Sequence, residues 1–362
     1  MAEILPAYGI ELEVMYMAKI EPNRNWVIPG NSFNYKYKIY RGIHPVIGGF
    51  FAHFNPGLLF RLLKNDYDIA VVGGMASPTH WLAPFFIGGN KKQIMSIESN
   101  LYSVKRKKGV GFILKNNILQ RANAYQVTGN PQIEYIKYFY PQASSKRFIR
   151  LPNLIDEDVF AHKVENLKKN KAFLRQKFGI ENNTQMWLLP ARLISIKGIM
   201  PFIKLLEGVK GVKLFLLGDG ELTQKIEGII IERKLPVVMV GFVQQEQVIE
   251  YYAAADLFVL PSLKDPSPLS PIEAIAAGLP LLVSSRIGNL EDVVQTNVNG
   301  WHYDPVKEIQ KGKDLLLAIA NKSREDLHQM GKKSQYRYEE KFNTEKCIRE
   351  YAKNLKQIVN EE

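Results

Sequence analysis

The sequence predicts an α/β protein with two domains, each a doubly wound, mostly parallel β-sheet covered by helices. Two observations support this prediction. The chain has 362 residues, which is enough for two domains of ordinary size. Short apolar runs alternate along it with segments of helical length, and this is the order expected for βα units around a parallel sheet.

In the first half, four short runs predict strands and two longer periodic segments predict helices. The run Asp-Ile-Ala-Val-Val-Gly at 68–73 is typical of a strand buried on both faces of a parallel sheet. We expect strands at 11–17, 68–73, 93–97 and 124–128, with helices at 56–64 and 113–121 among those between them.

A break at Pro152-Asn153 precedes a Lys- and Asn-rich stretch that runs to about residue 184. We interpret this stretch as a passage between domains with one exposed helix. Beyond it, we expect strands at 186–190, 212–218, 236–240, 257–261 and 279–284, and helices at 199–209, 220–234, 245–254 and 269–277. The polar segment 323–360 is predicted to be helical. The predicted domains are 1–152 and 153–340, followed by a C-terminal helix at 341–362.

The composition is that of a soluble globular protein, with 46% hydrophobic and 23% charged residues. No apolar run is long enough to span a bilayer, and the N-terminus lacks the pattern of a signal peptide. The single cysteine, Cys347, cannot form an internal disulfide, so a reducing compartment such as the cytosol is the simplest expectation.

The net charge of +12 is concentrated in the first half. Residues 1–150 hold 19 Lys and Arg against 8 Asp and Glu, a surplus of 11. The densest run is Lys105, Arg106, Lys107 and Lys108, which suits either a solvated loop or contact with phosphate or an anionic membrane.

Four clusters stand at the carboxyl ends of predicted strands in the second half, where open α/β sheets bind ligands. In the first, Arg192 and Lys197 flank a loop that leads into a helix. Two cations near a helix N-terminus suit a diphosphate, although such a pair alone is more often a surface cluster.

The second and third clusters are weaker signals on their own. Gly218 and Gly220 permit a tight turn and a close approach of the backbone, but Thr223 replaces the third glycine of a dinucleotide fingerprint. Phe242, which ends the next strand, could flank a base or belong to the core.

The fourth cluster carries two carboxylates, Asp265 and Glu273. Glu273 lies in a strongly apolar helix, where a carboxylate should have a partner. Ribose hydroxyls are one such partner, and a helix cap or an ion pair is the other interpretation.

Together these clusters resemble the retaining glycosyltransferases of family 4 (glycosyl transferases group 1). The resemblance covers about residues 150–305 well and the first half loosely. The matching elements are Arg-x4-Lys-Gly at 192–198, Gly-Asp-Gly at 218–220, Gly-Phe at 241–242, Tyr-x-x-Ala-Asp with the strand to Pro-Ser at 252–262, the acidic pair with Glu-Ala-x-Ala-x-Gly-x-Pro, and Asn-Gly at 299–300.

This resemblance implies the GT-B fold, in which two Rossmann-like domains face each other across a cleft and the last helix crosses back to the first domain. It implies that Arg192 and Lys197 hold the donor diphosphate and that Glu273 holds the ribose. Asp265 would face the donor sugar. The donor set would be completed by Gly218, Gly220, Phe242 near the base, and backbone N–H groups around Leu269 and Ser270 at the phosphates.

The chain also departs from the family pattern. Asp265 replaces a Glu, and Ser267-Pro268 replaces an aromatic–Gly pair, so that Pro268 has no N–H to donate. Glu98 and Asn100 stand on the acceptor side where many members carry a His. By this resemblance, we also expect that the sequence begins after the family's usual first strand and Gly-rich loop.

The resulting prediction is a hexosyltransferase that uses a nucleoside-diphosphate sugar, UDP before GDP, and retains the anomeric configuration. It would act in cell-surface polysaccharide or glycolipid assembly, without cofactor or metal and without a nucleic-acid partner. Its lipid-linked or saccharide acceptor would meet the basic first domain, with the protein cytoplasmic and peripheral at the inner membrane face. The alternatives are a nucleotide-sugar epimerase, a non-catalytic glycosyltransferase-like partner protein, and an NAD-dependent oxidoreductase, which the incomplete glycine fingerprint disfavours.

Overall fold

The structure is a computed structural model that describes residues 1–19, 33, 35–47, 50–64, 66–104, 109–157 and 159–360. The chain divides into two compact units. The first comprises Met1–Pro152 together with Glu345–Glu362, and the second comprises Asn153–Thr344. Each unit is a mixed α/β structure around its own core.

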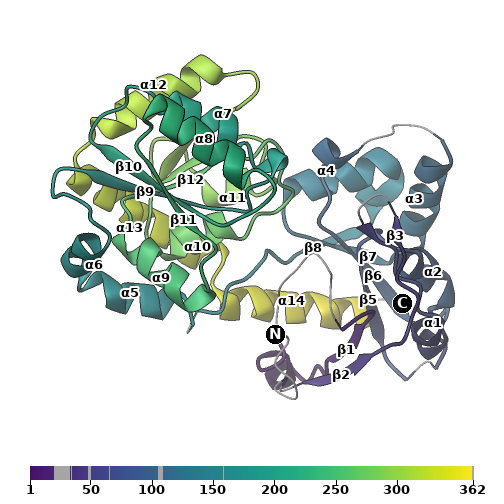
Figure 1. The fold of residues 1–362 in the computed structure, drawn as a ribbon. Helices are drawn as coiled ribbons and strands as arrows, with labels where there is room; N and C mark the ends of the chain where they lie inside the picture. Colours follow the sequence, from purple (N-terminus) through teal and green to yellow (C-terminus); the bar gives the residue numbers. More distant parts are fainter. Residues whose placement is uncertain are drawn as a thin grey trace. The chain divides into compact units, whose positions relative to one another are not determined.

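The second unit contains a six-stranded, fully parallel sheet in the order β11-β10-β9-β12-β13-β14 (Figure 1). From β9 the chain moves outward through β10 and β11, and it then returns to place β12 on the other side of β9. This reversal between β9 and β12 is the topological switch point of a doubly wound sheet. The strands are β9 Gln185–Pro190, β10 Val212–Leu217, β11 Val237–Gly241, β12 Leu257–Leu260, β13 Leu281–Ser284 and β14 Gly300–Tyr303.

Side chains along the central strands point alternately to the two faces of this sheet and form a hydrophobic core on each. In β9, Met186 and Leu188 pack into one apolar cluster, whereas Trp187 and Leu189 pack into the other. All four side chains are fully buried, as expected for a strand covered on both faces.

Helices cover both faces of the sheet (Figure 1). One face carries α7 Ile199–Leu205, α8 Thr223–Arg233 and α12 Ile309–Ala320. The other carries α5 Ala161–Lys168, α6 Lys171–Lys177, α9 Gln245–Ala254, α10 Ser270–Ala276 and α13 Arg324–Lys341, with the short α11 Leu290–Val293 packed on α13.

The stretch after Pro152 differs from the prediction of a linker with one exposed helix. It forms two helices, α5 and α6, and both pack against the sheet through buried Phe160, Val164 and Leu174. The apolar residues are sparse among the Lys and Asn, but their spacing is enough to place one face of each helix on the core.

The first unit is built on a four-stranded parallel sheet in the order β5-β6-β7-β8. Separate pairs are formed by β1 with β2, in parallel, and by β3 with β4, antiparallel. The strands are β1 Glu13–Tyr16, β2 Lys36–Ile39, β3 Val46–Ile47, β4 Phe50–Phe51, β5 Ile69–Gly73, β6 Lys92–Ile97, β7 Ala124–Val127 and β8 Arg147–Arg150.

The helices of the first unit follow the βα alternation. They are α1 Pro56–Leu62, α2 Pro78–Phe86, α3 Val110–Arg121 and α4 Asn130–Phe139, and α14 Thr344–Asn360 at the end of the chain groups with this unit. Tyr351 in α14 donates a hydrogen bond to Gln126 Oε1 of β7 at 2.7 Å. Among the described residues, no helix combines the length and apolar character that crossing a bilayer would need.

Candidate functional site

Backbone hydrogen bonds join the loops that follow β9, β10 and β12. The N–H of Leu193 donates to the carbonyl of Asp219 at 2.7 Å, and the N–H of Leu222 donates to the carbonyl of Leu193 at 3.0 Å. On the other side, the N–H of Leu263 donates to the carbonyl of Ile196 at 2.8 Å. The loop at 191–198 is therefore fixed between its two neighbours at the switch point of the sheet.

Three glycines make this close packing of backbones possible. A Cβ on Gly218 would lie 2.2 Å from the carbonyl oxygen of Ala191, and one on Gly220 would lie 2.6 Å from that of Leu193. Gly198 adopts a left-handed φ of 65°, and a Cβ there would lie 2.3 Å from the carbonyl oxygen of Pro261. The glycines are needed for the contact between loops, because any side chain would collide with backbone.

The three loops bring a cation and an anion together. Lys197 Nζ lies 2.5 Å from Asp265 Oδ2, and both side chains are mostly buried. Arg192 is exposed on the same loop as Lys197 and has no ion pair within the described part of the chain. An ammonium has three hydrogens, so Lys197 can keep this partner and still donate to another anion.

Glu273 lies in the first turn of α10 with its carboxylate largely removed from solvent. Burial raises the pKa of this carboxyl group, whereas a hydrogen bond from Tyr252 acts in the opposite direction. The Tyr252 hydroxyl donates to Glu273 Oε2 at 2.9 Å. Glu273 therefore has a partner inside the protein, which the sequence did not reveal.

The loop between β12 and α10 is held by two asparagines that sequence reasoning missed. Asn153 Nδ2 donates to the carbonyl of Ser267 at 3.0 Å, and Asn289 Nδ2 donates to the carbonyl of Pro268 at 2.8 Å. These contacts span 114 and 21 residues, so no local pattern could have indicated them. These two hydrogen bonds hold in place the segment that runs from Asp265 to the start of α10.

The other predicted donor residues are accessible to a ligand to different degrees. Phe242 follows β11 and is exposed, so it is not a core residue. Leu269 is exposed at the start of α10, and Ser270 is half-buried. Gly220 is exposed and Gly218 half-buried, with both at the carboxyl end of β10.

The predicted acceptor-side residues lie in the first unit, after β6. Glu98 is exposed, and its carbonyl accepts a hydrogen bond from Gln132 Nε2 at 3.2 Å. Asn100 is buried at 1% exposure, which is less accessible than an acceptor contact requires. The run Lys105, Arg106, Lys107 and Lys108 lies outside the described residues.

The chemistry of the second unit's site follows from these groups. Lys197 contacts the Asp265 carboxylate, Arg192 is exposed on the same loop, and Glu273 has a buried carboxyl group in the helix that follows β12. Groups of these kinds can bind a polyanion that also carries hydroxyl groups. Within the described ranges, no three His, Cys, Asp or Glu side chains are grouped so that they could hold a metal ion.

Comparison with known proteins places a family match on this unit. Residues 170–337 match the family model described as glycosyl transferases group 1. The chain is 29% identical over 175 residues to an uncharacterized glycosyltransferase of Methanocaldococcus jannaschii. This aligned region covers 44% of this chain and 45% of that protein. It is 27% identical over 208 residues to N-acetyl-alpha-D-glucosaminyl L-malate synthase of Bacillus anthracis, covering 55% and 51%.

A third relative is lipopolysaccharide 1,2-N-acetylglucosaminetransferase of Salmonella typhimurium, 24% identical over 53% of this chain and 54% of that protein. The chain thus spans about half the length of the curated relatives it matches. These relatives are glycosyltransferases, and the match supports the predicted superfamily.

Solved structures share the fold over most of the chain. Sucrose-phosphate synthase from Thermosynechococcus elongatus has a TM-score of 0.70 at 18% identity, covering 99% of this chain and 92% of that one. HepE from Anabaena, solved in complex with UDP, has a TM-score of 0.70 at 18% identity, covering 89% and 86%. These neighbours are GT-B glycosyltransferases, and they confirm the predicted α/β fold with two Rossmann-like domains.

Proposed function

We propose that this chain transfers a sugar from a nucleoside-diphosphate donor to a hydroxyl acceptor, with retention at the anomeric carbon. The observation that carries the proposal is the contact of Lys197 with Asp265 at the switch point of the second unit's sheet, with Glu273 in the first turn of the helix that follows β12. Open α/β sheets bind nucleotides at this place. The Lys197 ammonium suits the diphosphate, and the carboxyl groups of Asp265 and Glu273 can accept hydrogen bonds from sugar hydroxyls. The match to group 1 glycosyltransferases covers these residues.

In this proposal Lys197 and Arg192 hold the donor diphosphate. When the bond between the anomeric carbon and the diphosphate breaks, negative charge develops on the leaving nucleotide. A cation already fixed in position stabilises that charge without reorganisation during the reaction. Lys197 is fixed by Asp265, and the exposed Arg192 is available for the phosphates.

The two carboxyl groups take different parts of the donor. Asp265 uses Oδ2 for Lys197, which leaves Oδ1 to accept a hydrogen bond from a hydroxyl of the donor sugar. Glu273 accepts hydrogen bonds from the ribose hydroxyls. A ribose contact exists before and during the reaction, so it contributes to binding more than to rate.

The donor is proposed to be a UDP-sugar, with a GDP-sugar as the second choice and a hexosyl group transferred. HepE binds UDP in its solved complex, which supports this order of preference. Exposed Phe242 would lie beside the base, whereas Gly218, Gly220, Leu269 and Ser270 would supply backbone contacts to the phosphates. No metal is required in this proposal, because cationic side chains replace it.

The proposed acceptor is a saccharide or lipid-linked glycan in cell-surface polysaccharide or glycolipid assembly, met by the first unit. Two of the curated relatives act on such molecules by name: lipopolysaccharide 1,2-N-acetylglucosaminetransferase and alpha-monoglucosyldiacylglycerol synthase. Glu98 is the proposed acceptor-side residue because its side chain is exposed, whereas Asn100 is buried.

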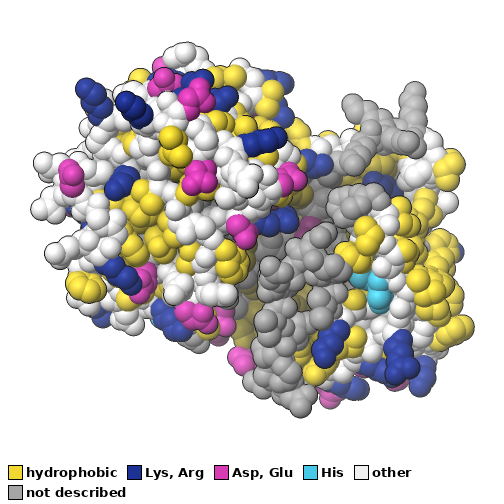
Figure 2. All heavy atoms as spheres, viewed as in Figure 1, with side chains coloured by type: hydrophobic (Ala, Val, Ile, Leu, Met, Phe, Trp, Pro, Cys, Tyr) yellow, Lys and Arg dark blue, Asp and Glu magenta, His cyan; other side chains and the backbone are white. Residues whose placement is uncertain are grey.

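A peripheral position at an anionic, cytoplasmic membrane face is part of this proposal. Hydrophobic side chains gather over α2 with Lys and Arg nearby (Figure 2). Phe60 of α1 and Trp81 and Phe85 of α2 are exposed, and the Arg121 guanidinium lies 4.1 Å from the Phe85 ring centre. Helices α1, α2 and α3 contain no Asp or Glu. Aromatic side chains with flanking cations suit a membrane interface.

The membrane part has its own test. Binding to vesicles with anionic lipid should be salt-sensitive and much stronger than binding to neutral vesicles. Replacing Phe85 by Ser, or the run 105–108 by four Ser, should weaken it without changing nucleotide affinity. Equal binding to both vesicle types, or a comparable affinity for duplex DNA, would contradict the proposed membrane contact.

The test of the proposed activity is incubation of the protein with UDP-sugars, with and without saccharide and lipid-linked acceptors. Acceptor-dependent release of UDP, with product of retained anomeric configuration by NMR, is the expected result. Conversion of the sugar nucleotide without acceptor would identify an epimerase. Nucleotide binding with no turnover of any donor would identify a non-catalytic partner protein.

A further inference from the structure

We infer that Tyr252 is a positioning residue that holds the Glu273 carboxylate in the orientation for a nucleoside diphosphate. This inference rests on the proposed function, because it assigns a task to a residue beside the proposed donor site. Tyr252 lies in the last turn of α9, on a different element from Glu273, which begins α10.

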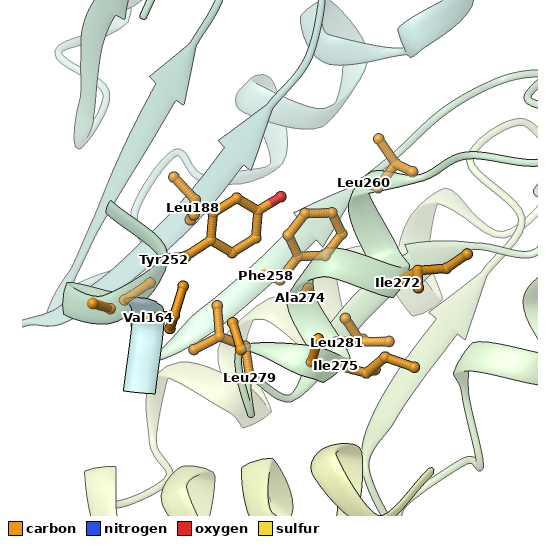
Figure 3. Packing of buried hydrophobic residues seen from close by; sticks show 14 of the residues in the cluster. Val164, Leu188, Tyr252, Phe258, Leu260, Ile272, Ala274, Ile275, Leu279 and Leu281 are labelled. Atoms are coloured by element: carbon orange, nitrogen blue, oxygen red, sulfur yellow. The ribbon is translucent and has the colours of Figure 1, made fainter. Parts of the chain in front are cut away.

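Packing fixes the Tyr252 ring. The side chain is fully buried, with its ring centre 5.0 Å from that of Phe160 in an edge-to-face contact and 6.3 Å from that of Phe258 in a stacked one. Figure 3 shows the ring beside Phe258 and Leu188, with the Tyr252 hydroxyl as the one side-chain oxygen among the labelled residues. A fully buried ring that packs against two aromatic neighbours has little freedom to move its hydroxyl away.

The direction of the hydroxyl proton follows from two distances. The hydroxyl oxygen lies 2.9 Å from Glu273 Oε2 and 3.4 Å from the carbonyl oxygen of Ser270. Since a phenol has one proton to donate, the shorter and charge-assisted bond to Glu273 takes it. Within the described part of the chain, the Glu273 side chain is bonded by Tyr252 through Oε2 alone. One carboxylate oxygen is therefore held, and the other is left for a ligand.

The electrostatics of the pair give this contact a measurable effect. Burial raises the pKa of Glu273, and the hydrogen bond from Tyr252 is the described interaction that lowers it. Without the hydroxyl, the charged form loses its stabilising donor, so the pKa of Glu273 should rise further. A protonated or rotated carboxyl group would accept fewer hydrogen bonds from ribose.

The decisive variant is Tyr252→Phe, which keeps the ring and removes the hydroxyl. Its affinity for UDP and for GDP, measured by calorimetry from pH 5 to 8, should fall about tenfold at neutral pH. The acid side of its affinity profile should move to higher pH, whereas kcat for a working donor should change less than KM. The matched control is Tyr251→Phe, because the Tyr251 ring stacks on Phe178 and the hydroxyl bonded to Glu273 belongs to Tyr252.

A double-mutant cycle separates positioning from a general loss of structure. In a Glu273→Ala background, adding Tyr252→Phe should cause no further loss of UDP affinity, since its target is gone. Additive losses would overturn the inference, as would wild-type affinity in Tyr252→Phe. If Tyr252→Phe does not fold, Glu273→Asp replaces it, because the shorter side chain withdraws the carboxylate from the phenol and should weaken UDP binding similarly.

A ligand-free measurement distinguishes failure of this inference from failure of the proposed function. Carbon-13 NMR of labelled Glu, assigned with Glu273→Gln, should show a higher Glu273 pKa in Tyr252→Phe than in the wild type. If the Glu273 pKa shifts in this way but the wild type binds neither UDP nor GDP, the proposed nucleotide binding is refuted. Nucleotide binding with an unchanged pKa and unchanged affinity would refute the role of Tyr252 alone.

Discussion

Replacing Asp256 by Asn should strongly destabilise the second unit. Asp256 stands just before β12, is 5% exposed, and forms ion pairs with Arg175 at 2.7 Å and Lys171 at 2.8 Å. It also accepts the N–H of Met186 at 2.9 Å, which ties the start of β12 to β9. The Asp256 carboxylate therefore adds to the backbone pairing that joins β12 to β9, on either side of the switch point.

The magnitude follows from what the substitution leaves behind. Asn is the same size but neutral, so the Arg175 guanidinium, whose side chain is also 5% exposed, would remain buried without a counter-charge. Removing one partner of a buried ion pair costs about 3–5 kcal/mol. A typical free energy of unfolding is about 5–15 kcal/mol, so this loss is a large fraction of it.

The assay is urea unfolding followed by tryptophan fluorescence, with Trp187 in β9 as a buried reporter. The control is Glu207→Gln, which breaks a pair with Arg233 at 2.8 Å in which both side chains are exposed. An exposed pair is worth about 0–1 kcal/mol. A free energy of unfolding for Asp256→Asn within 1 kcal/mol of the control would refute this reasoning.

The same residue predicts a pH dependence. Burial alone would raise the pKa of Asp256, but the charges of Lys171 and Arg175 outweigh it and lower that pKa below its usual value. A carboxyl group with a lowered folded-state pKa contributes stability above its unfolded pKa of about 3.9, and this is lost as pH falls through the folded value. The wild type should therefore lose stability in acid more steeply than Asp256→Asn.

Three further predictions concern the site. Arg192→Ala and Lys197→Ala should each lower kcat by the equivalent of about 2–4 kcal/mol while the protein stays folded, and near-normal kcat in both would remove them from the site. Glu273→Ala should mainly weaken UDP binding, whereas Asp265→Ala should lower kcat or alter donor choice. Calorimetry that shows unchanged UDP affinity in Glu273→Ala would refute the contact of Glu273 with the ribose. Gly198→Ala should lower the free energy of unfolding by more than about 1 kcal/mol, because it adds a side chain at a left-handed φ next to the carbonyl oxygen of Pro261. An unchanged urea midpoint would show that the loop accommodates the side chain.

The sequence predicted the second unit's sheet well, because buried parallel strands are continuous apolar runs. All five strands expected there are present within two residues of the predicted bounds. It missed β14 and the helix α12. For the stretch that forms α5 and α6, the sequence predicted a passage between domains with one exposed helix, because few residues of these Lys-rich helices reach the core.

The candidate site was predicted residue by residue but not as a connected structure. The pairing of Lys197 with Asp265 spans 68 residues, and that of Tyr252 with Glu273 spans 21. Such contacts depend on how strands are ordered in the sheet, and local patterns do not contain that information. The glycines at 218 and 220 were interpreted as a turn near phosphates, and the structure adds that backbone carbonyls leave no room for a side chain.

The measurement that tests the central claim most directly is calorimetric titration of the full chain with UDP and GDP, in the wild type and in Lys197→Ala. The account predicts saturable binding at one site in the wild type, tighter for UDP, and clearly weaker binding in the variant, since a cation facing the diphosphate is lost. Absence of binding by either nucleotide to a folded wild-type protein would contradict it. So would equal affinity in the two proteins, because the diphosphate would then lie away from the switch point.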